Sequence, residues 1–255
     1  MAGNSFSGAT SVTARALSLL AAFDERHREM TLTELAGRAG MPVPTAYRLI
    51  HELVTWGALE RLADGSYVIG RRLWGVGLLT PAHAGLSQLA SPFLHDLYGA
   101  TLATVHLAER DGTKVLYLDR LSGHASVPVV SRIGSRLPLH ATGVGKVLLA
   151  HAPADIQRAV MGELTRITTY TITQPGRLRQ ELARVHRDGF ASTSEEMSLG
   201  ACSVAVPIHG PTGDVVAALG IVVGSFRRDR PRLVAALQVA ARGIGRSLAG
   251  ADFAE

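Results

Sequence analysis

A glycine-rich stretch with a lysine, HATGVGKVLLA at residues 140–150, resembles a phosphate-binding loop at first sight. A Walker loop needs Ser or Thr directly after its Gly-Lys pair and a Gly five positions before the second Gly, but this chain has Val147 and His140 there. A dinucleotide fingerprint fails as well, because Leu148 stands where the third Gly belongs. The spacing therefore excludes both kinds of nucleotide loop.

The same stretch predicts a helix that begins beside two glycines. Backbone N–H groups at a helix start can hold an anion, so Thr142, Gly143 and Gly145 are candidates for binding a carboxylate. The alternative is that the glycines allow close backbone packing where no side chain fits.

Glu195, Glu196 and Cys202 are further candidates for chemistry. Adjacent residues of a strand point to opposite faces, so the two glutamates are poorly placed to act as an acid-base pair. We expect the Glu196 carboxylate to face a cavity and to select a ligand, together with Ser192. Cys202 alternates with Val204 on one strand face and has no recognisable base nearby, which favours a pocket wall over a nucleophile.

The ten histidines show no HExxH or similar metal-ligand spacing, and a single cysteine excludes a disulfide framework or a multi-cysteine metal site. No triad pattern or cofactor loop accompanies them. We therefore expect no required metal, no cofactor and no enzymatic activity.

Short polar side chains near residue 45 could meet DNA. A helix in the major groove must offer such side chains on its outer face while an apolar face anchors it. Thr45 and Tyr47 are candidates for contact with base edges, and Arg48 for contact with phosphate. The other candidates for DNA contact are Arg15, Thr33, Pro44, Arg61 and Tyr67. For Arg61 and Tyr67 the alternative is a solvated hairpin.

Three helices and a hairpin are expected to position these residues. Apolar spacing predicts a first helix over residues 12–23, a second with Thr33 as its N-cap, and a third from Pro44, as first residue, to Trp56. Strands at 59–62 and 67–69 flank a turn signal. This order is typical of a winged helix-turn-helix, the alternative being a small helical domain with an appended hairpin.

The rest of the chain mixes strands and helices. Strands are expected at residues 103–109, 114–121, 127–130, 190–194, 202–208 and 215–223, and helices at 144–150, 154–161, 178–187 and 231–248. The order indicates an α+β domain around an antiparallel sheet. A helical connection with a break at 81–85 precedes it. The predicted parts are a flexible N-terminus (1–10), a DNA-binding domain (11–70), a linker helix (71–85) and the α+β domain (86–250).

Composition excludes several classes of protein. With 47% hydrophobic residues and 18% charged residues, intrinsic disorder is excluded. No apolar run approaches the roughly 20 residues of a membrane span, and the first residues lack a signal-peptide core, so we expect a cytoplasmic protein without membrane contact. The net charge of +5, from 24 arginines and two lysines, favours anionic partners, nucleic acid first.

Six segments together resemble one family, the IclR-type bacterial transcriptional regulators, over residues 11–248. In the first half these are SVTARALSLLAAF, LTELAGRAGMPVPTAYRLIHEL and GALERLADGSYVIGRRLWGVG. In the second half they are IGSRLPLHATGVGKVLLA, GFASTSEEMSLGACSVAVPI and GDVVAALGIVVG. The two halves in this order are far more specific than either motif alone.

The resemblance implies a winged helix-turn-helix, a linker helix and a GAF-like effector-binding domain, assembled as homodimers or dimers of dimers on double-stranded operator DNA. It supports Cys202 as pocket wall. Two departures stand out: Val43-Pro44 replaces a frequent Lys-Ser, and residues 192–194 lack a frequent Asp, which puts operator choice and ligand in question. Apolar candidates for the effector pocket are Val130, Leu139, Val204, Ile221 and Val223.

The hypothesis that follows is an effector-responsive regulator of a metabolic operon, controlled by a small organic acid. One alternative is an enzyme with an appended helical domain and Glu195, Glu196 or Cys202 as its catalyst. Another is a DNA-packaging protein without a ligand, for which a diffuse basic surplus would suffice.

Overall fold

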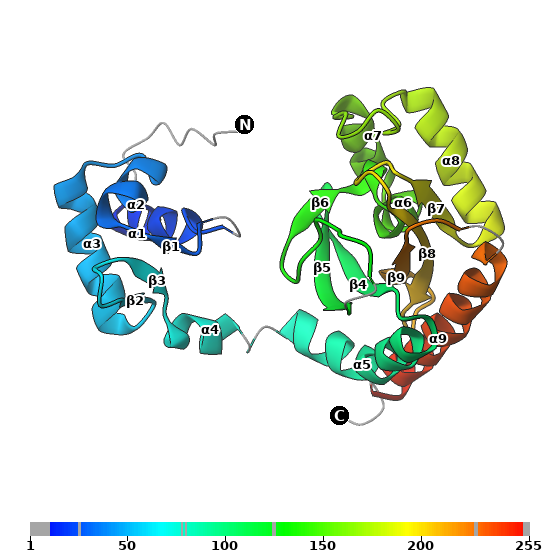
Figure 1. Cartoon of the computed structure of the whole chain (residues 1–255), viewed down its shortest axis with the longest axis horizontal. Helices are drawn as coiled ribbons and strands as arrows, with labels where there is room; N and C mark the ends of the chain where they lie inside the picture. The colour runs from blue at the N-terminus through cyan, green and yellow to red at the C-terminus, as the bar shows by residue number, and fades with distance from the viewer. Residues whose placement is uncertain are drawn as a thin grey trace. The chain divides into compact units, whose positions relative to one another are not determined.

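Contacts along the chain divide it into two units, Met1–Ala84 and Gly85–Glu255, which we describe separately (Figure 1). The structure is a computed structural model that describes residues 11–24, 27–77, 79, 81–123, 126–226 and 229–251. The first ten residues, predicted to be flexible, lie outside this part. Within it, no helix is both long and apolar enough to cross a bilayer.

Helices and a small sheet make up the first unit. Its helices are α1 (Val12–Ala21), α2 (Leu32–Arg38) and α3 (Val43–Trp56). Its strands, β1 (Glu29–Met30), β2 (Leu59–Arg61) and β3 (Tyr67–Ile69), pair antiparallel in the order β1-β3-β2. One apolar cluster joins these elements, including Leu19, Leu35, Ala46, Ile50 and Leu59. The helices and the hairpin agree with the sequence; β1 was not expected.

The cap of α2 corrects one expectation. The helix begins at Leu32, and Thr31 Oγ1 accepts a hydrogen bond from the Glu34 N–H (3.4 Å). Glu34 Oε2 in turn accepts from the Thr31 N–H (2.8 Å), which completes a capping box. Thr33, expected as the cap, lies exposed in the first turn. At α3, Pro42 is the N-cap, so Pro44 occupies the second helical position rather than the first.

Helix α4 (Arg71–Gly77) follows the hairpin and has no buried residue. The first turn of α4 contacts the last residue of α3. The Arg72 guanidinium lies 4.5 Å from the centroid of the Trp56 ring, and Nη1 donates to the Trp56 carbonyl oxygen (3.2 Å). The C-terminal end of α3 and the start of α4 are therefore in direct contact.

A six-stranded antiparallel sheet forms the centre of the second unit. Its strands are β4 (Thr104–Asp111), β5 (Lys114–Leu121), β6 (Arg136–Pro138), β7 (Ala191–Ser194), β8 (Cys202–His209) and β9 (Val215–Val223). They lie in the order β6-β5-β4-β9-β8-β7. Helices cover both faces, so both faces are apolar along much of their length.

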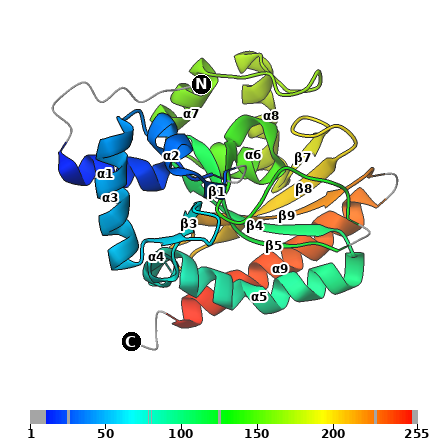
Figure 2. The same ribbon diagram turned by 60° about the vertical axis from the view of Figure 1, so that its left-hand side comes forward.

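Each face packs against its own helices, as Figure 2 shows. Helices α5 (Pro81–Thr101) and α9 (Arg230–Ala251) cover the face that carries Val204, Val206 and Ile208. Helices α6 (Gly143–Ala150), α7 (Ala154–Gly162) and α8 (Pro175–Asp188) cover the opposite face, which carries Ala205. Alternate residues of β8 thus belong to different cores.

Two further expectations are wrong. Residues 127–130 are not a strand; the edge strand is β6, which pairs with β5. The break expected at 81–85 lies inside α5, which begins at Pro81 because proline is tolerated in the first turn of a helix. Both errors come from reading local residue types without knowing the tertiary partners.

Candidate functional site

Helix α3 presents a free outer face. Pro44, Tyr47 and Arg48 are exposed, and Thr45 is half-buried, whereas Ala46 and Ile50 on the opposite face are buried. The Tyr47 side chain is 56% exposed, although aromatic residues usually contribute to a core. The face predicted to meet DNA is therefore available for contact within this unit.

The other DNA candidates divide into two groups. Arg15 on α1, Thr33 on α2 and Arg61 on the hairpin are exposed. Tyr67 is only 5% exposed and belongs to the core, with the Arg61 guanidinium 5.9 Å from its ring centroid. Tyr67 therefore stabilises the hairpin from inside, and its predicted contact with DNA is not retained.

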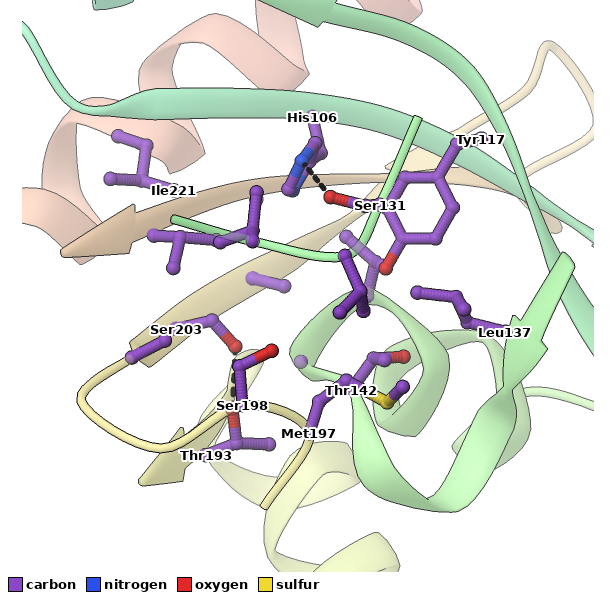
Figure 3. Close-up of a pocket in the computed structure, with 18 of the residues that line it drawn as sticks. His106, Tyr117, Ser131, Leu137, Thr142, Thr193, Met197, Ser198, Ser203 and Ile221 are labelled. Atoms are coloured by element: carbon purple, nitrogen blue, oxygen red, sulfur yellow. Dashed lines mark hydrogen bonds between the residues drawn. The ribbon is translucent and has the colours of Figure 1, made fainter. Parts of the chain in front are cut away.

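A cavity lies in the second unit between the sheet, helix α6 and the segments at 129–131 and 197–201 (Figure 3). Its polar lining side chains are His106, Tyr117, Ser131, Thr142, Thr193, Ser198 and Ser203. The cavity is thus lined by hydroxyl groups and two aromatic rings among apolar side chains.

Two hydrogen bonds order the lining (Figure 3). Ser131 Oγ lies 2.7 Å from His106 Nε2, and Thr193 Oγ1 lies 2.6 Å from Ser203 Oγ. The His106 and Tyr117 rings meet edge to face with centroids 4.9 Å apart. One hydroxyl group thus lies beside the two rings, and two others pair with each other elsewhere in the lining.

Burial keeps the titratable lining groups uncharged. Desolvation, assisted by the nearby positive charge of Arg120, lowers the pKa of His106 to about 3. Desolvation also raises the pKa of Tyr117, and its hydrogen bond with Thr142 opposes the shift. Both side chains are neutral at pH 7, so they can offer a ligand hydrogen bonds and ring contacts but no charge.

The structure divides the predicted effector residues. Val130, Thr142 and Gly143 line the cavity, and Val204 and Ile221 border it while their side chains pack in the core under α5 and α9. The predicted residues outside the cavity lining are Leu139, Gly145, Ser192, Glu196, Cys202 and Val223.

The pairing of the strands explains why three of these residues lie outside the cavity. Ser192 pairs with Val204, and Cys202 pairs with Val223, so all of them share the sheet face opposite the cavity. Cys202 is buried, with its sulfur 3.5 Å from Ser194 Oγ. Neighbouring residues of a strand point to opposite faces, so the residue next to one that lines the cavity points away from it.

Close packing accounts for Gly145 and Leu139. A Cβ atom at Gly145 would lie 2.4 Å from the Leu139 carbonyl oxygen, and the Gly145 N–H already donates to Thr142 Oγ1 (3.1 Å). Leu139 itself is fully buried in the core under α6. The packing interpretation of this glycine therefore holds. Gly143 is also tightly packed, against Ser203, at the cavity wall.

Glu196 binds a buried lysine instead of facing the cavity. Its Oε1 lies 2.5 Å from Lys146 Nζ, and the two side chains are 9% and 2% exposed. Glu195 has a φ of +56°, which ends the strand alternation assumed for the glutamates and turns the next side chain inward. Desolvation raises the pKa of Glu196 and the charge of Lys146 opposes the rise.

Sequence reasoning missed six polar residues of the lining: His106, Tyr117, Ser131, Thr193, Ser198 and Ser203. Ser203 interrupts the apolar residues of β8, which is a signal that could have identified it. β7 carries Ser192, Thr193 and Ser194 in succession, so residue type alone did not distinguish Thr193. Ser131 had no such signal, because it lies outside regular structure.

Two family models match the chain. Residues 12–63 match the IclR helix-turn-helix domain, and residues 80–246 match the bacterial transcriptional regulator IclR C-terminal domain. The chain belongs to the IclR family of transcriptional regulators. This is a family of regulators rather than enzymes, so the expectation of no enzymatic activity is confirmed.

Several relatives of this IclR-family regulator are similar over nearly their whole length. The regulator XynR of Escherichia coli is 32% identical over 222 residues, covering 86% of this chain and 88% of XynR. KdgR of the same species is 31% identical over 232 residues, covering 89% of this chain and 88% of KdgR. Both are HTH-type transcriptional regulators.

Solved structures agree with the fold of this IclR-family chain. An IclR homolog from Microbacterium hydrocarbonoxydans, in complex with 4-hydroxybenzoate, aligns with a TM-score of 0.90 and 34% identity, covering 93% of this chain and 99% of the homolog. The Thermotoga maritima IclR aligns with a TM-score of 0.76 and 29% identity, covering 93% of this chain and 98% of that IclR. The chain is thus a DNA-binding transcriptional regulator with a ligand-binding C-terminal domain.

Proposed function

We propose that the outer face of α3 reads the operator of this regulator. Thr45 and Tyr47 contact base edges, Arg48 contacts phosphate, and Pro44 shapes the start of the helix. Arg15, Thr33 and Arg61 add contacts from α1, α2 and the hairpin. The observation that carries this proposal is the exposure of Tyr47 and Arg48 opposite the buried Ala46 and Ile50.

The test is binding of the Tyr47→Ala/Arg48→Ala double variant to DNA from the chain's own promoter. We expect affinity to fall at least about tenfold, because a base contact and a phosphate contact are each lost. Arg158→Gln, which removes an exposed charge on α7, is the control. Unchanged affinity in the double variant would remove α3 from the interface.

We also propose that the cavity binds the effector and that the effector is a small organic acid. The Microbacterium hydrocarbonoxydans homolog was solved in complex with 4-hydroxybenzoate, an aromatic monocarboxylate, and this supports a ligand of that kind. In this chain, Val130, Thr142 and Gly143 lie on the cavity together with His106, Tyr117 and Ser203. Hydroxyl groups beside two aromatic rings suit a ligand of that kind.

Filling the cavity tests this proposal. Ser203→Trp places a large ring where Ser203 Oγ and Gly143 already pack closely, so we expect ligand binding to be lost while DNA affinity without ligand is kept. Cys202→Trp adds the same ring on the opposite sheet face, outside the cavity lining, and is the variant with which Ser203→Trp is compared. Calorimetric titration that shows normal ligand uptake by Ser203→Trp would place the ligand elsewhere.

The assembly completes the proposal. A homodimer, or a dimer of dimers, binds a roughly palindromic operator of a metabolic operon, and the linker over residues 71–85 transmits ligand binding. The coupling rests on different ligand affinities of two arrangements, typically ~1–3 kcal/mol. A single operator-bound copy in analytical ultracentrifugation would contradict the dimer.

A further inference from the structure

No charged side chain lines the cavity in the described part of the chain, yet a cation lies beside it. Arg120 on β5 pairs directly with His106 on β4, so the two share a sheet face, the face that carries the cavity. Its charge is near enough to lower the pKa of His106. Lys146, a cation on α6, already binds Glu196.

The Arg120 side chain has no hydrogen-bond or ion-pair partner among the described residues, and its Nε is buried. A second atom on the same sheet face is in the same condition: Thr104 Oγ1, in a residue that is 0% exposed. Thr104 lies two residues before His106 on β4 and pairs with Val222, which lines the cavity. Buried polar groups without partners are uncommon in proteins and call for an explanation.

We infer that Arg120 and Thr104 form the anion-binding end of the cavity and that Arg120 selects an effector with a carboxylate. This inference rests on the proposed effector site. A carboxylate accepts a charge-assisted hydrogen bond from the guanidinium and one from the threonine hydroxyl, which satisfies both unpartnered groups. The rest of the ligand packs on the His106 and Tyr117 rings. The effector class is therefore a small monocarboxylate with an apolar or aromatic body.

A pair of matched probes tests the inference on the full chain. Benzoate carries the carboxylate and benzamide is its neutral counterpart of nearly equal shape; acetate and acetamide form a smaller pair. We expect calorimetry to show carboxylates binding at least about tenfold more tightly than the amides. Arg120→Gln should abolish this preference, Arg120→Lys should keep part of it, and Arg158→Gln should leave it unchanged.

Stability without ligand separates recognition from a structural role. Because the Arg120 charge has no counter-ion, we expect Arg120→Gln to unfold at the same temperature as the unaltered chain or at a higher one. A lower unfolding temperature would make Arg120 a structural residue and overturn the inference. Unchanged carboxylate affinity in Arg120→Gln, or equal affinity for acid and amide, would overturn it and leave the effector cavity intact.

Failure of the proposed function has a different signature. If Ser203→Trp still binds benzoate, the probe lies outside the cavity and both proposals fail. If the unaltered chain binds neither member of either pair, the inference and the organic-acid effector fail together.

Discussion

His106 is held neutral within the cavity wall, and this makes the second unit sensitive to acid. Its pKa is about 3 in the folded chain against 6.5 ordinarily, so between these values the unfolded chain binds a proton that the folded chain does not. The contribution of neutral His106 to the free energy of unfolding is therefore fully present above pH 6.5 and decreases as the pH falls toward 3. We expect it to account for about 2 kcal/mol of lost stability between pH 7 and pH 5.

Urea unfolding of His106→Asn at these two pH values measures the effect. The variant should lose less stability on acidification than the unaltered chain. His95→Asn, at an exposed histidine of α5, should not differ from the unaltered chain. An equal pH dependence in all three chains would show that His106 is not the group responsible.

The buried pair of Lys146 and Glu196 ties α6 to the segment that follows β7. Removing one partner leaves the other charge buried, so Glu196→Ala should cost about 3–5 kcal/mol of unfolding free energy. The double variant Lys146→Met/Glu196→Ala should cost less than Glu196→Ala alone. Glu181→Ala, in the partly exposed pair with Arg184, should cost below about 1 kcal/mol. Denaturant titration checks these values, and a double variant less stable than the single one would contradict them.

Residue types alone do not tell which face of the sheet a side chain points to, and this limits how far a site can be predicted. The alternation over 202–208 was correctly read, but both sheet faces are covered by helices, so periodicity could not tell the cavity face from the other. Ser192 and Cys202 therefore lie on the face opposite the cavity, whereas Thr142 and Gly143, which depend on a helix start, lie in its lining.

At the scale of elements, the capping box of α2 yields a prediction. Thr31→Ala removes the hydroxyl that accepts from Glu34 N–H and should lower stability by about 1 kcal/mol. Thr33→Ala should change it by less than about 0.5 kcal/mol, because Thr33 is exposed and does not cap the helix. Thermal unfolding compares the two, and a larger effect at Thr33 would restore the original expectation for this residue.

Long elements with strong periodicity were predictable, and short ones that depend on a partner were not. The pattern located α3, β5 and β9 to within a residue or two. β1 and β6 have two and three residues, and they are strands only because β3 and β5 pair with them. The apolar residues near 130 look like a strand locally, but they cover the cavity instead.

At the scale of the molecule, effector and operator must affect each other reciprocally. If a ligand weakens operator binding by a given factor, the operator must weaken ligand binding by the same factor. We expect a factor of about 5–150, which calorimetry of the ligand with and without saturating operator DNA would measure. Equal ligand affinity in both titrations, alongside a ligand effect on DNA binding, would show that the two assays report different species.

The contact of Arg72 with Trp56 has a mechanical consequence. The guanidinium contacts both the indole ring and the carbonyl oxygen at the end of α3. With α3 as the operator-reading helix proposed above, we expect a displacement of residues 71–77 to move that helix as well.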